Sequence, residues 1–465
     1  MDADNNIKMK RLIFTVFSCI LLGLGNHAAY SQVKKWTLNE CVNYALEKNI
    51  SIRQSKLDYE SSQIDKKVAR GNFLPTINAS GQHNWINGLT QNVTTGILEI
   101  QTTQNSSFNG TVGIDIYKGL QHQNTFRRSK LALIASQYQL LKMQEDVALN
   151  VANAYLQVLF NRENLKVQKE LLHLDSIQMN RTGQLVDAGT LPRGDLLDIK
   201  ATVSGDNQKK IAAENQLLIS KLSLAQLLQL DDFQNFDVAD EDYDSKENAV
   251  MMELPSAIYA KAKEQRTELK IAKANLEVAE KDVTIARGGY QPSLQGFYNF
   301  NTRISYSDIP VSLGNNQFTT IPAPRFWDQF VDNKGHTFGV QLSVPILNGF
   351  SVRNNVQRAK VALERSKIAY EQSELDLERN VYTAFTDAQG ALKSYEAAEV
   401  AVEARKEAFR YATERYEVGL INTLDLNQSQ TLYANAQSEV LRTKYDYMFR
   451  VKILEFYFGI PIIQK

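Results

Sequence analysis

The chain has 465 residues, of which 43% are hydrophobic and 22% are charged, enough for a sizeable core or for several domains. Its 52 Lys and Arg residues balance its 52 Asp and Glu residues, so no net positive field would recruit nucleic acid or an anionic lipid surface. We therefore expect no nucleic-acid partner.

The N-terminal segment, 1–31, has the pattern of an export signal. Basic residues precede an apolar run, and a small-residue cleavage site follows it: Lys8, Lys10 and Arg11, then residues 12–24, then residues 29–31. We expect the mature chain to begin at Gln32, with Met9 as an alternative start. The run is too short to cross a bilayer as a helix and no later run exceeds it, so we expect no membrane-spanning helix in the mature chain.

Two cysteines are present, and only Cys41 would remain after cleavage of the signal, which excludes a disulfide framework. Residues 16–19, which end at Cys19, loosely match a lipoprotein cleavage site, and lipidation is the alternative processing route. Because the apolar run continues past Cys19, ordinary cleavage is favoured.

Proline breaks helix interiors, and the prolines of this chain separate stretches rich in Ala, Leu, Gln, Glu and Lys. In chain order, helices are predicted over residues 36–69, 120–186, 195–230, 256–287, 350–417 and 425–458. The two longest would each measure roughly 100 Å at about 1.5 Å per residue. Two short helices placed end to end have roughly the length of one long helix. We therefore expect the helices to build a rod of uniform thickness.

Four short segments between the helices alternate apolar with polar side chains, which predicts strands over residues 77–85, 108–117, 294–300 and 337–344. The second segment has the length and the alternation of a tilted membrane-barrel strand. A soluble, half-buried sheet is the alternative. Four strands cannot close a barrel, and open edges in lipid leave backbone groups unpaired, so we expect a homotrimer that supplies twelve strands.

Residues 350–417 carry an apolar repeat of seven. Its first position is filled by Val381, Ala388, Tyr395, Val402, Phe409 and Tyr416, and its second by Ala384, Ala391, Ala398 and Ala412, with Arg405 as the exception. This is the pattern of a coiled-coil seam. Alanine permits close approach of a neighbouring helix, so the stripe indicates core packing rather than a cofactor site.

The chain contains an internal duplication. Ala45 matches Ala262 and Pro75 matches Pro292 at one fixed spacing, and a slightly larger spacing relates Gly119 to Gly349, Gly189 to Gly419 and Asp195 to Asp425. The difference between the two spacings falls in a longer insert over residues 302–335.

The duplication divides the chain into five parts. These are a signal peptide (1–31), a first structural repeat (32–230), an acidic inter-repeat linker (231–254), a second structural repeat (255–460) and a C-terminal tail (461–465). We expect the linker to be solvated, because it is dense in Asp and Glu.

Each copy contains a glycine followed six positions later by an aspartate, Gly189 with Asp195 and Gly419 with Asp425. A glycine in the left-handed conformation ends a helix, so each phrase predicts the turn of a helical hairpin. Each aspartate would then cap or electrostatically complement the start of the return helix.

Four phrases, in order and in duplicate, resemble TolC-type outer membrane efflux proteins over almost the whole mature chain. They are WTLNECVNYALEKNISI from Trp36, FLPTINASG from Phe73, VQLSVPILNGF from Val340 and ERYEVGLINTLDLNQSQTLYANAQ from Glu414. The resemblance implies a mainly α fold with a small β part. It further implies a homotrimer whose outer membrane β-barrel, with four strands per protomer, continues into a periplasmic α-barrel. This duct would dock onto a periplasmic adaptor (membrane fusion protein) and an inner membrane pump of the resistance-nodulation-division (RND) or ABC type.

The same resemblance implies functional residues at the tips of the hairpins. Asp425 matches one aspartate of the family's aperture, whereas the second falls on Gln428, and Asp195 and Asp198 occupy the equivalent positions of the first copy. Three symmetry-related Asp425 carboxylates would form a ring that selects cations and controls opening. Adaptor contacts are implied at Ala188, Gly189 and Thr190 and at Val418, Gly419 and Leu420, where Ala188 departs from the usual valine and nearby Pro192 stiffens only the first tip.

The sequence offers no metal-ligand spacing, phosphate loop or nucleophile elbow, so we expect neither an enzyme nor a cofactor. The histidines, His27, His83, His122, His173 and His336, are isolated. Within the same fold, a type I protein-secretion outlet is the alternative to an efflux duct. A periplasmic coiled-coil adaptor or scaffold is less favoured, since an adaptor would need one hairpin rather than two.

Overall fold

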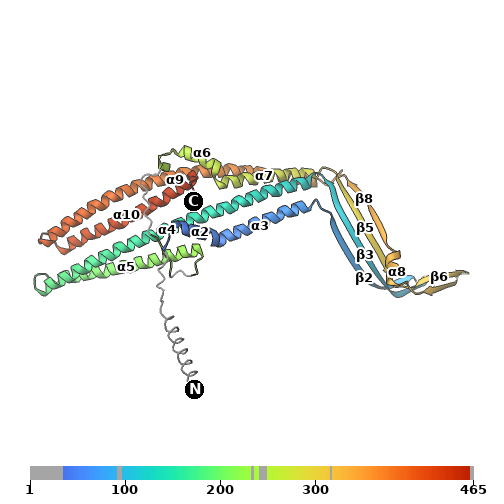
Figure 1. Cartoon of the computed structure of the whole chain (residues 1–465), viewed down its shortest axis with the longest axis horizontal. Coiled ribbons are helices and arrows are strands. Elements are labelled where there is room, and N and C mark those ends of the chain that lie inside the picture. Colours follow the sequence, from blue (N-terminus) through green and yellow to red (C-terminus); the bar gives the residue numbers. More distant parts are fainter. Residues whose placement is uncertain (1–34, 92–96, 232–234, 240–248, 315–316, 461–465) are drawn as a thin grey trace, which may run out of the picture.

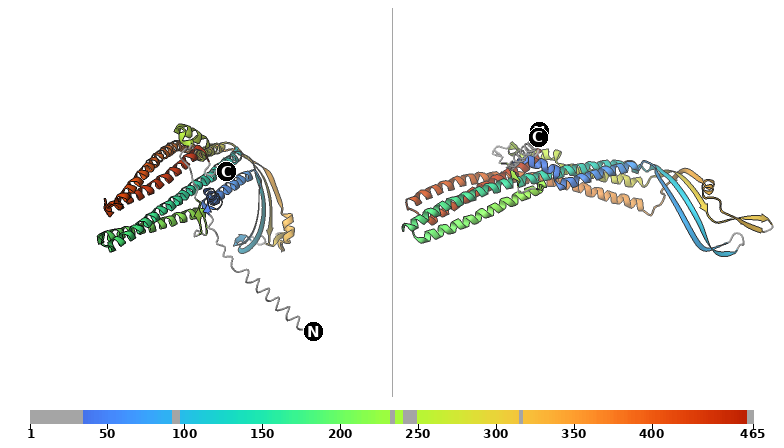
Figure 2. Two further views of the ribbon diagram at one scale, coloured as in Figure 1. Left: turned by 60° about the vertical axis from the view of Figure 1, so that its left-hand side comes forward. Right: turned by 60° about the horizontal axis from the view of Figure 1, so that its bottom comes forward.

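The protein is described here by a computed structural model covering residues 35–91, 97–231, 235–239, 249–314 and 317–460. The expected signal peptide and the C-terminal tail lie outside the described residues. Figure 1 shows an elongated molecule with two helical hairpins at one end and a β-sheet at the other, and Figure 2 shows the same arrangement from two further sides.

The helices occur in two matched sets, which confirms the internal duplication. The first copy contains α2 (Leu38–Lys48), α3 (Ile50–Gly71), α4 (Gln121–Asp187) and α5 (Arg193–Leu228). The second copy contains α6 (Pro255–Gln265), α7 (Thr267–Gly288), α9 (Ser351–Glu417) and α10 (Thr423–Phe458). Corresponding helices have the same lengths, 11, 22, 67 and 36 residues in order.

The prediction of one continuous helix over residues 36–69, and of another over residues 256–287, was wrong. Each stretch is two helices, because Asn49 and Arg266 have extended backbones with ψ of 132° and 131°. Asn49 accepts a hydrogen bond from the Ser51 backbone N–H at 2.9 Å and donates one to the Leu227 carbonyl at 3.0 Å. A side chain that caps the next helix and contacts a distant one therefore stabilises this break.

The alanine-rich seam of α9 is buried as predicted, over the part nearer the middle of the molecule. Val381 and Ala388 are fully buried, and Ala384, Ala391, Tyr395 and Ala398 nearly so. Val402, Phe409 and Tyr416, nearer the tip, are half-buried. Helix α10 runs along α9, and the Tyr395 and Tyr447 rings stack across them at 6.3 Å.

The largest core surrounds the middle of α4 and includes part of the segment between the copies. Strand β1 (Lys35–Trp36) pairs in parallel with β4 (Asp237–Val238), and Phe236 and Val238 are buried against α4. Asp237 forms ion pairs with Arg162 and Lys221. The expectation of a wholly solvated linker was therefore wrong for these residues, because they complete the core.

The sheet contains the four predicted strands in the order β2 (Thr76–Gln91), β3 (Leu98–Lys118), β5 (Ser293–Ser305) and β8 (Gly335–Ser343), all antiparallel. The long insert is structured too, with β6 (Ile309–Gly314), β7 (Gln317–Ile321) and α8 (Phe326–Asp332), none of which was predicted. Among the described residues, no helix combines the length and the apolar character needed to cross a membrane.

The sheet and the helices join as one layer. Each strand continues into a helix, and the neighbouring helices lie in the order α3, α4, α7, α9, which repeats the order of the strands. At this junction Gly119, with φ of +55°, and Gly288 approach so closely that a Cβ on either would collide with the backbone oxygen of the other. The two copies therefore touch backbone to backbone where the sheet meets the helices.

Candidate functional site

Both hairpin tips have the backbone conformation that the glycine spacing predicted. Gly189 and Gly419 are left-handed, with φ of +74° and +76°. The N–H after each glycine donates to a carbonyl five positions back, Thr190 to Leu185 at 2.9 Å and Leu420 to Arg415 at 2.8 Å. These bonds satisfy carbonyls that the helix end leaves free, and so they end α4 and α9 in the same way.

The side chains of the two tips differ although their backbones agree. In the second copy Val418 and Leu420 are apolar and 70% and 68% exposed. In the first copy Ala188 is small, and the Thr190 hydroxyl donates to the Leu185 carbonyl at 2.7 Å. The second tip therefore offers an exposed apolar surface that the first tip lacks.

The candidate aperture residues lie at the starts of α5 (Asp195 and Asp198) and α10 (Asp425 and Gln428). Asp195 and Asp425 are each the third residue of their helix, where a carboxylate is favourable to the helix dipole. Neither is the N-cap: Asn422 accepts the Asp425 backbone N–H at 2.8 Å. Asp198 and Gln428 follow one turn later, and the side chains of Asp198, Asp425 and Gln428 are exposed while that of Asp195 is half-buried.

Polar contacts join the two hairpins between their tips and the middle of the molecule. The sequence analysis did not predict these contacts. Gln178 of α4 donates to the Tyr416 hydroxyl at 3.0 Å, and Arg181 lies 3.6 Å from Glu417. Farther from the tips, Ser438 of α10 contacts Asn164 at 3.2 Å. The partners belong to different copies and lie far apart in the chain, so no local pattern could reveal them.

A buried acid pair lies within the same interface. Asp175 of α4 and Asp206 of α5 are each 3% exposed, and Gln430 of α10 donates to Asp175 at 2.7 Å. Burial and the neighbouring Asp206 carboxyl raise the pKa of Asp175 to about 7. Lys209 pairs with Oδ1 of Asp206 at 3.0 Å, whereas Oδ2 is buried and accepts no hydrogen bond from the residues that the structure describes. Protonation of Asp175 would relieve the repulsion between the two carboxyls.

A signal for this pair was present in the sequence. The position of the second copy that is equivalent to Asp175 is Arg405, the exception in the alanine-rich seam. Elsewhere this seam position is alanine in the second copy, whereas in the first copy it is mostly polar, with Asn161, Gln168 and Thr182. The signal therefore lies in the second copy, where Arg405 interrupts the alanines. The first copy buries the Asp175 carboxyl, whereas Arg405 is exposed.

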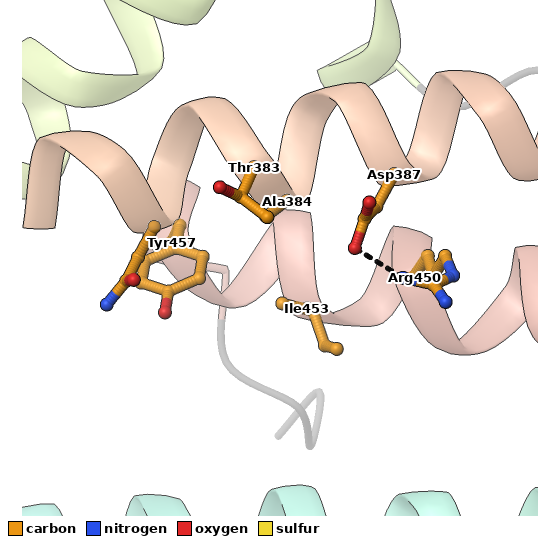
Figure 3. A pocket seen from close by; sticks show the side chains of 7 residues that line it. Thr383, Ala384, Asp387, Arg450, Ile453 and Tyr457 are labelled. Carbon is orange, nitrogen blue, oxygen red and sulfur yellow. Dashed lines mark hydrogen bonds and ion pairs between the residues drawn. The ribbon is translucent and has the colours of Figure 1, made fainter.

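A cavity of about 260 Å³ lies between α9 and α10, roughly 45 Å from the tip at about 1.5 Å per residue. Figure 3 shows Asp387 and Arg450 facing one another in it, with Thr383, Ile453 and Tyr457 nearby. Arg450 pairs with both Asp387 and Asp446, so its charge is compensated. Nowhere in the described ranges do three or more His, Cys, Asp or Glu side chains gather as a metal site would require.

Comparisons with known proteins agree with this architecture. The outer membrane protein TolC of Vibrio cholerae is 24% identical over 66% of this chain and 66% of its own length, and the toluene efflux pump outer membrane protein TtgC of Pseudomonas putida is 21% identical over 87% and 79%. The Campylobacter jejuni CmeC outer membrane channel has the same fold, with a TM-score of 0.74 at 18% identity over 91% of this chain and 86% of its own.

The family-level match covers nearly the whole helical and strand framework. The sequence profile of the family described as outer membrane efflux protein matches residues 41–229 and 258–459, one segment for each copy. The long hairpins, the small sheet and the left-handed tip glycines all lie within these segments. The protein is therefore a TolC-type member of the outer membrane efflux protein family and resides in the outer membrane.

Proposed function

We propose that three copies of this chain form a closed channel through the outer membrane and act as the exit duct of a tripartite efflux system. The proposal rests on the four-stranded sheet. Its outermost strands, β2 and β8, each leave one edge unpaired within the described part of the chain. An unpaired edge in lipid costs several kcal/mol per backbone group. Three sheets joined edge to edge supply twelve strands and leave no edge.

The side chains of the sheet support the same assembly. Ile77, Phe338, Val340 and Leu342 lie on one face, and each is at least 65% exposed. The opposite face carries Thr337, Gln341 and other polar residues. An exposed apolar face suits lipid, and the polar face would then line the lumen.

The helices extend the duct away from the membrane. Because α3, α4, α7 and α9 continue the strands in the same order, three copies would place twelve helices in a ring below the barrel. Helices α4 and α9 have 67 residues each, roughly 100 Å at about 1.5 Å per residue. The tips would thus meet partners far from the outer membrane.

A matched pair of variants tests the assembly. Val340→Arg places a charge on the apolar face and is expected to abolish insertion, since arginine at mid-membrane costs about 2–4 kcal/mol in a barrel. Gln341→Arg, on the opposite face of β8, should still give a heat-modifiable trimer that conducts ions across a planar bilayer. A wild-type protein that stays a soluble, non-conducting monomer would rule out the channel.

The first-turn residue Asp425 is proposed to form the aperture, because its carboxylate is exposed at the start of α10 and threefold symmetry would gather three of them. Asp425→Asn should lower the preference for cations in reversal-potential measurements. Asp198→Asn, on the other hairpin, serves as the comparison. An unchanged preference in Asp425→Asn would place the constriction elsewhere.

The second tip is proposed as the stronger contact for a periplasmic adaptor, since Val418 and Leu420 are exposed and apolar. Leu420→Ser should reduce adaptor capture by the purified trimer more than Ala188→Ser. Identifying the pump that comes down with the adaptor separates an RND efflux pump from an ABC exporter. Capture of a protein-secretion ATPase alone would instead assign a type I secretion outlet.

A further inference from the structure

Helix α8 packs on the apolar face of the sheet. The Phe330 ring centre lies 5.7 Å from that of Phe108 on β3 and 6.1 Å from that of Phe300 on β5. The Phe326 ring centre lies 6.0 Å from that of Phe108. Gly110 of β3 lies opposite Phe300 of β5 on the same face, and a Cβ there would contact the Phe300 side chain. Helix α8 therefore covers the face whose other apolar side chains are exposed.

The helix is held in place by hydrogen bonds to the free edge of β5. Strand β8 pairs with β5 only as far as Asn301. Beyond that point the Gln329 side chain accepts from the Ser305 N–H and donates to the Ser305 carbonyl, both at 2.9 Å, and Asn333 donates to the Arg303 carbonyl at 2.7 Å. Side chains of α8 and the residue that follows it thus replace the missing strand, and the helix has a fixed position.

Helix α8 lies at one border of the part of the sheet that the membrane would cover. From Ile116, near the helices, to Phe108 is a distance of about 26 Å along the strand at about 3.3 Å per residue. In a strand tilted by about 35–45°, this spans roughly 20 Å along the membrane normal. The apolar band of outer membrane barrels is about 25 Å tall and is bordered by aromatic residues. In Figure 1 α8 lies toward the end of the sheet remote from the helices. The helix is therefore placed at the outer border of the band.

The surface that α8 turns away from the sheet is aromatic and apolar. Trp327 is 70% exposed and Val331 is 49% exposed, although the Trp327 ring contacts the partly buried Phe330 ring at 5.7 Å. Charged Arg325 and Asp328 lie beside them in the sequence and are exposed. Tryptophan with an apolar body and a polar N–H favours membrane–water interfaces, and charged side chains favour the aqueous side.

We propose that α8 is an interfacial anchor: it lies outside the barrel at the outer surface of the membrane and inserts Trp327 and Val331 between lipid acyl chains. The occupant of this surface is lipid, because the surface continues the lipid-facing side of the sheet without interruption. Within the described residues only the second copy contains such a helix, so a trimer carries three anchors around its rim. The inference rests on the membrane-spanning sheet proposed above.

The test uses the intact protein in proteoliposomes and the fluorescence of tryptophan. The difference in emission between the wild type and Trp327→Phe isolates Trp327 and leaves Trp36 and Trp85 unchanged. Lipids brominated in the upper part of their acyl chains should remove most of this difference emission, whereas aqueous iodide should have little effect. Loss of the signal to iodide, or protection from both quenchers as in a contact between subunits, would overturn the proposal.

Two further variants in the Trp327→Phe background separate this inference from the channel itself. Phe338→Trp places the probe on the apolar face of β8, and Thr337→Trp places it on the opposite face. If brominated lipid quenches Phe338→Trp but not Trp327, the anchor is wrong and the barrel stands. If it quenches neither, both are wrong. Heat-modifiable migration verifies that each variant has assembled.

Discussion

The first and the second copy have helices of equal length but bury different side chains. The middle of α4 is surrounded by α2, α5, α10 and β4, and it buries large residues such as Tyr155, Leu156 and Leu159. The equivalent part of α9 buries mainly alanines against α10 and α6. The first copy thus provides most of the largest hydrophobic core of the protomer, and the second provides a slender hairpin with the apolar tip.

This difference shows that the duplication preserves backbone dimensions rather than packing. In the proposed trimer the two copies alternate around a ring, and equal helix lengths would give that ring an even wall. Helix length depends on where prolines and tip glycines fall. The side chains between those points were free to diverge. One copy could therefore become the core while the other kept small residues that allow close and adjustable contact with α10.

The largest expected effect on stability tests the hydrophobic core around α4. Tyr155 is fully buried and its hydroxyl donates to the Ala239 carbonyl at 2.9 Å, whereas the equivalent Phe385 is half-buried. Tyr155→Ala should lower the free energy of unfolding by about 3–5 kcal/mol, as expected for a large core side chain, and Phe385→Ala by clearly less. Urea unfolding followed by circular dichroism measures both. Equal losses would mean that the copies share the core evenly.

The next effect concerns the buried acid pair. A carboxyl whose pKa is raised by folding, here Asp175 to about 7, binds more protons in the folded than in the unfolded chain between about pH 4 and pH 7. Stability should therefore fall as the pH rises through this window. Asp175→Asn imitates the protonated form, so it should flatten this dependence and stabilise the protein at pH 8 by on the order of 2 kcal/mol.

The equivalent residue of the second copy is the control for that prediction. Arg405 is exposed, so Arg405→Ala should change stability by less than about 0.5 kcal/mol and leave the pH dependence intact. Unfolding curves recorded at several pH values compare the two variants. An unaltered slope in Asp175→Asn would show that Asp175 is ionised throughout.

The tip glycines should respond alike, in contrast to the two cores. Alanine at a left-handed position costs about 1–2 kcal/mol, and a Cβ at Gly189 or Gly419 meets no atom of the described chain within 4 Å, so the cost is conformational. Gly189→Ala and Gly419→Ala are expected to destabilise equally in thermal melts. A marked difference would indicate that the two turns are not equivalent.

The smallest effect distinguishes the starts of the return helices. Asn422 caps α10 with its side chain, whereas Pro192 gives α5 no side-chain cap. Asn422→Ala should cost about 1 kcal/mol, and Asn422→Asp, which keeps the acceptor oxygen, should retain stability. Thermal melts of the two variants make the comparison, and a loss in both would point to a role for the amide other than capping.

The sequence was sufficient for the features that depend on nearby residues. The long proline-free stretches indicated α4 and α9, whose bounds lie within one residue of the predicted ones, and Gly189 and Gly419 marked the turns. The breaks at Asn49 and Arg266 were missed because neither residue forbids a helix. The extended conformation of Asn49 is stabilised by a contact with the Leu227 carbonyl, far away in the chain.

The tip residues and the buried acids illustrate the same limit. The turns around Gly189 and Gly419 follow from backbone conformation alone, whereas the pairing of Asp175 with Gln430 joins residues 255 positions apart. Helix α8 lacked the apolar periodicity of a longer helix, since it is only 7 residues long and is stabilised by Phe108, Ser305 and their neighbours.

The meeting of Gly119 with Gly288 sets how stiffly the outer membrane part is mounted on the periplasmic part. With no side chains between them, the two backbones leave no layer of side chains that could compress or slide. In the proposed channel, a force applied at the tips would therefore reach the sheet through direct backbone contact. A methyl group at either position would act as a wedge that forces the two copies apart where the sheet meets the helices.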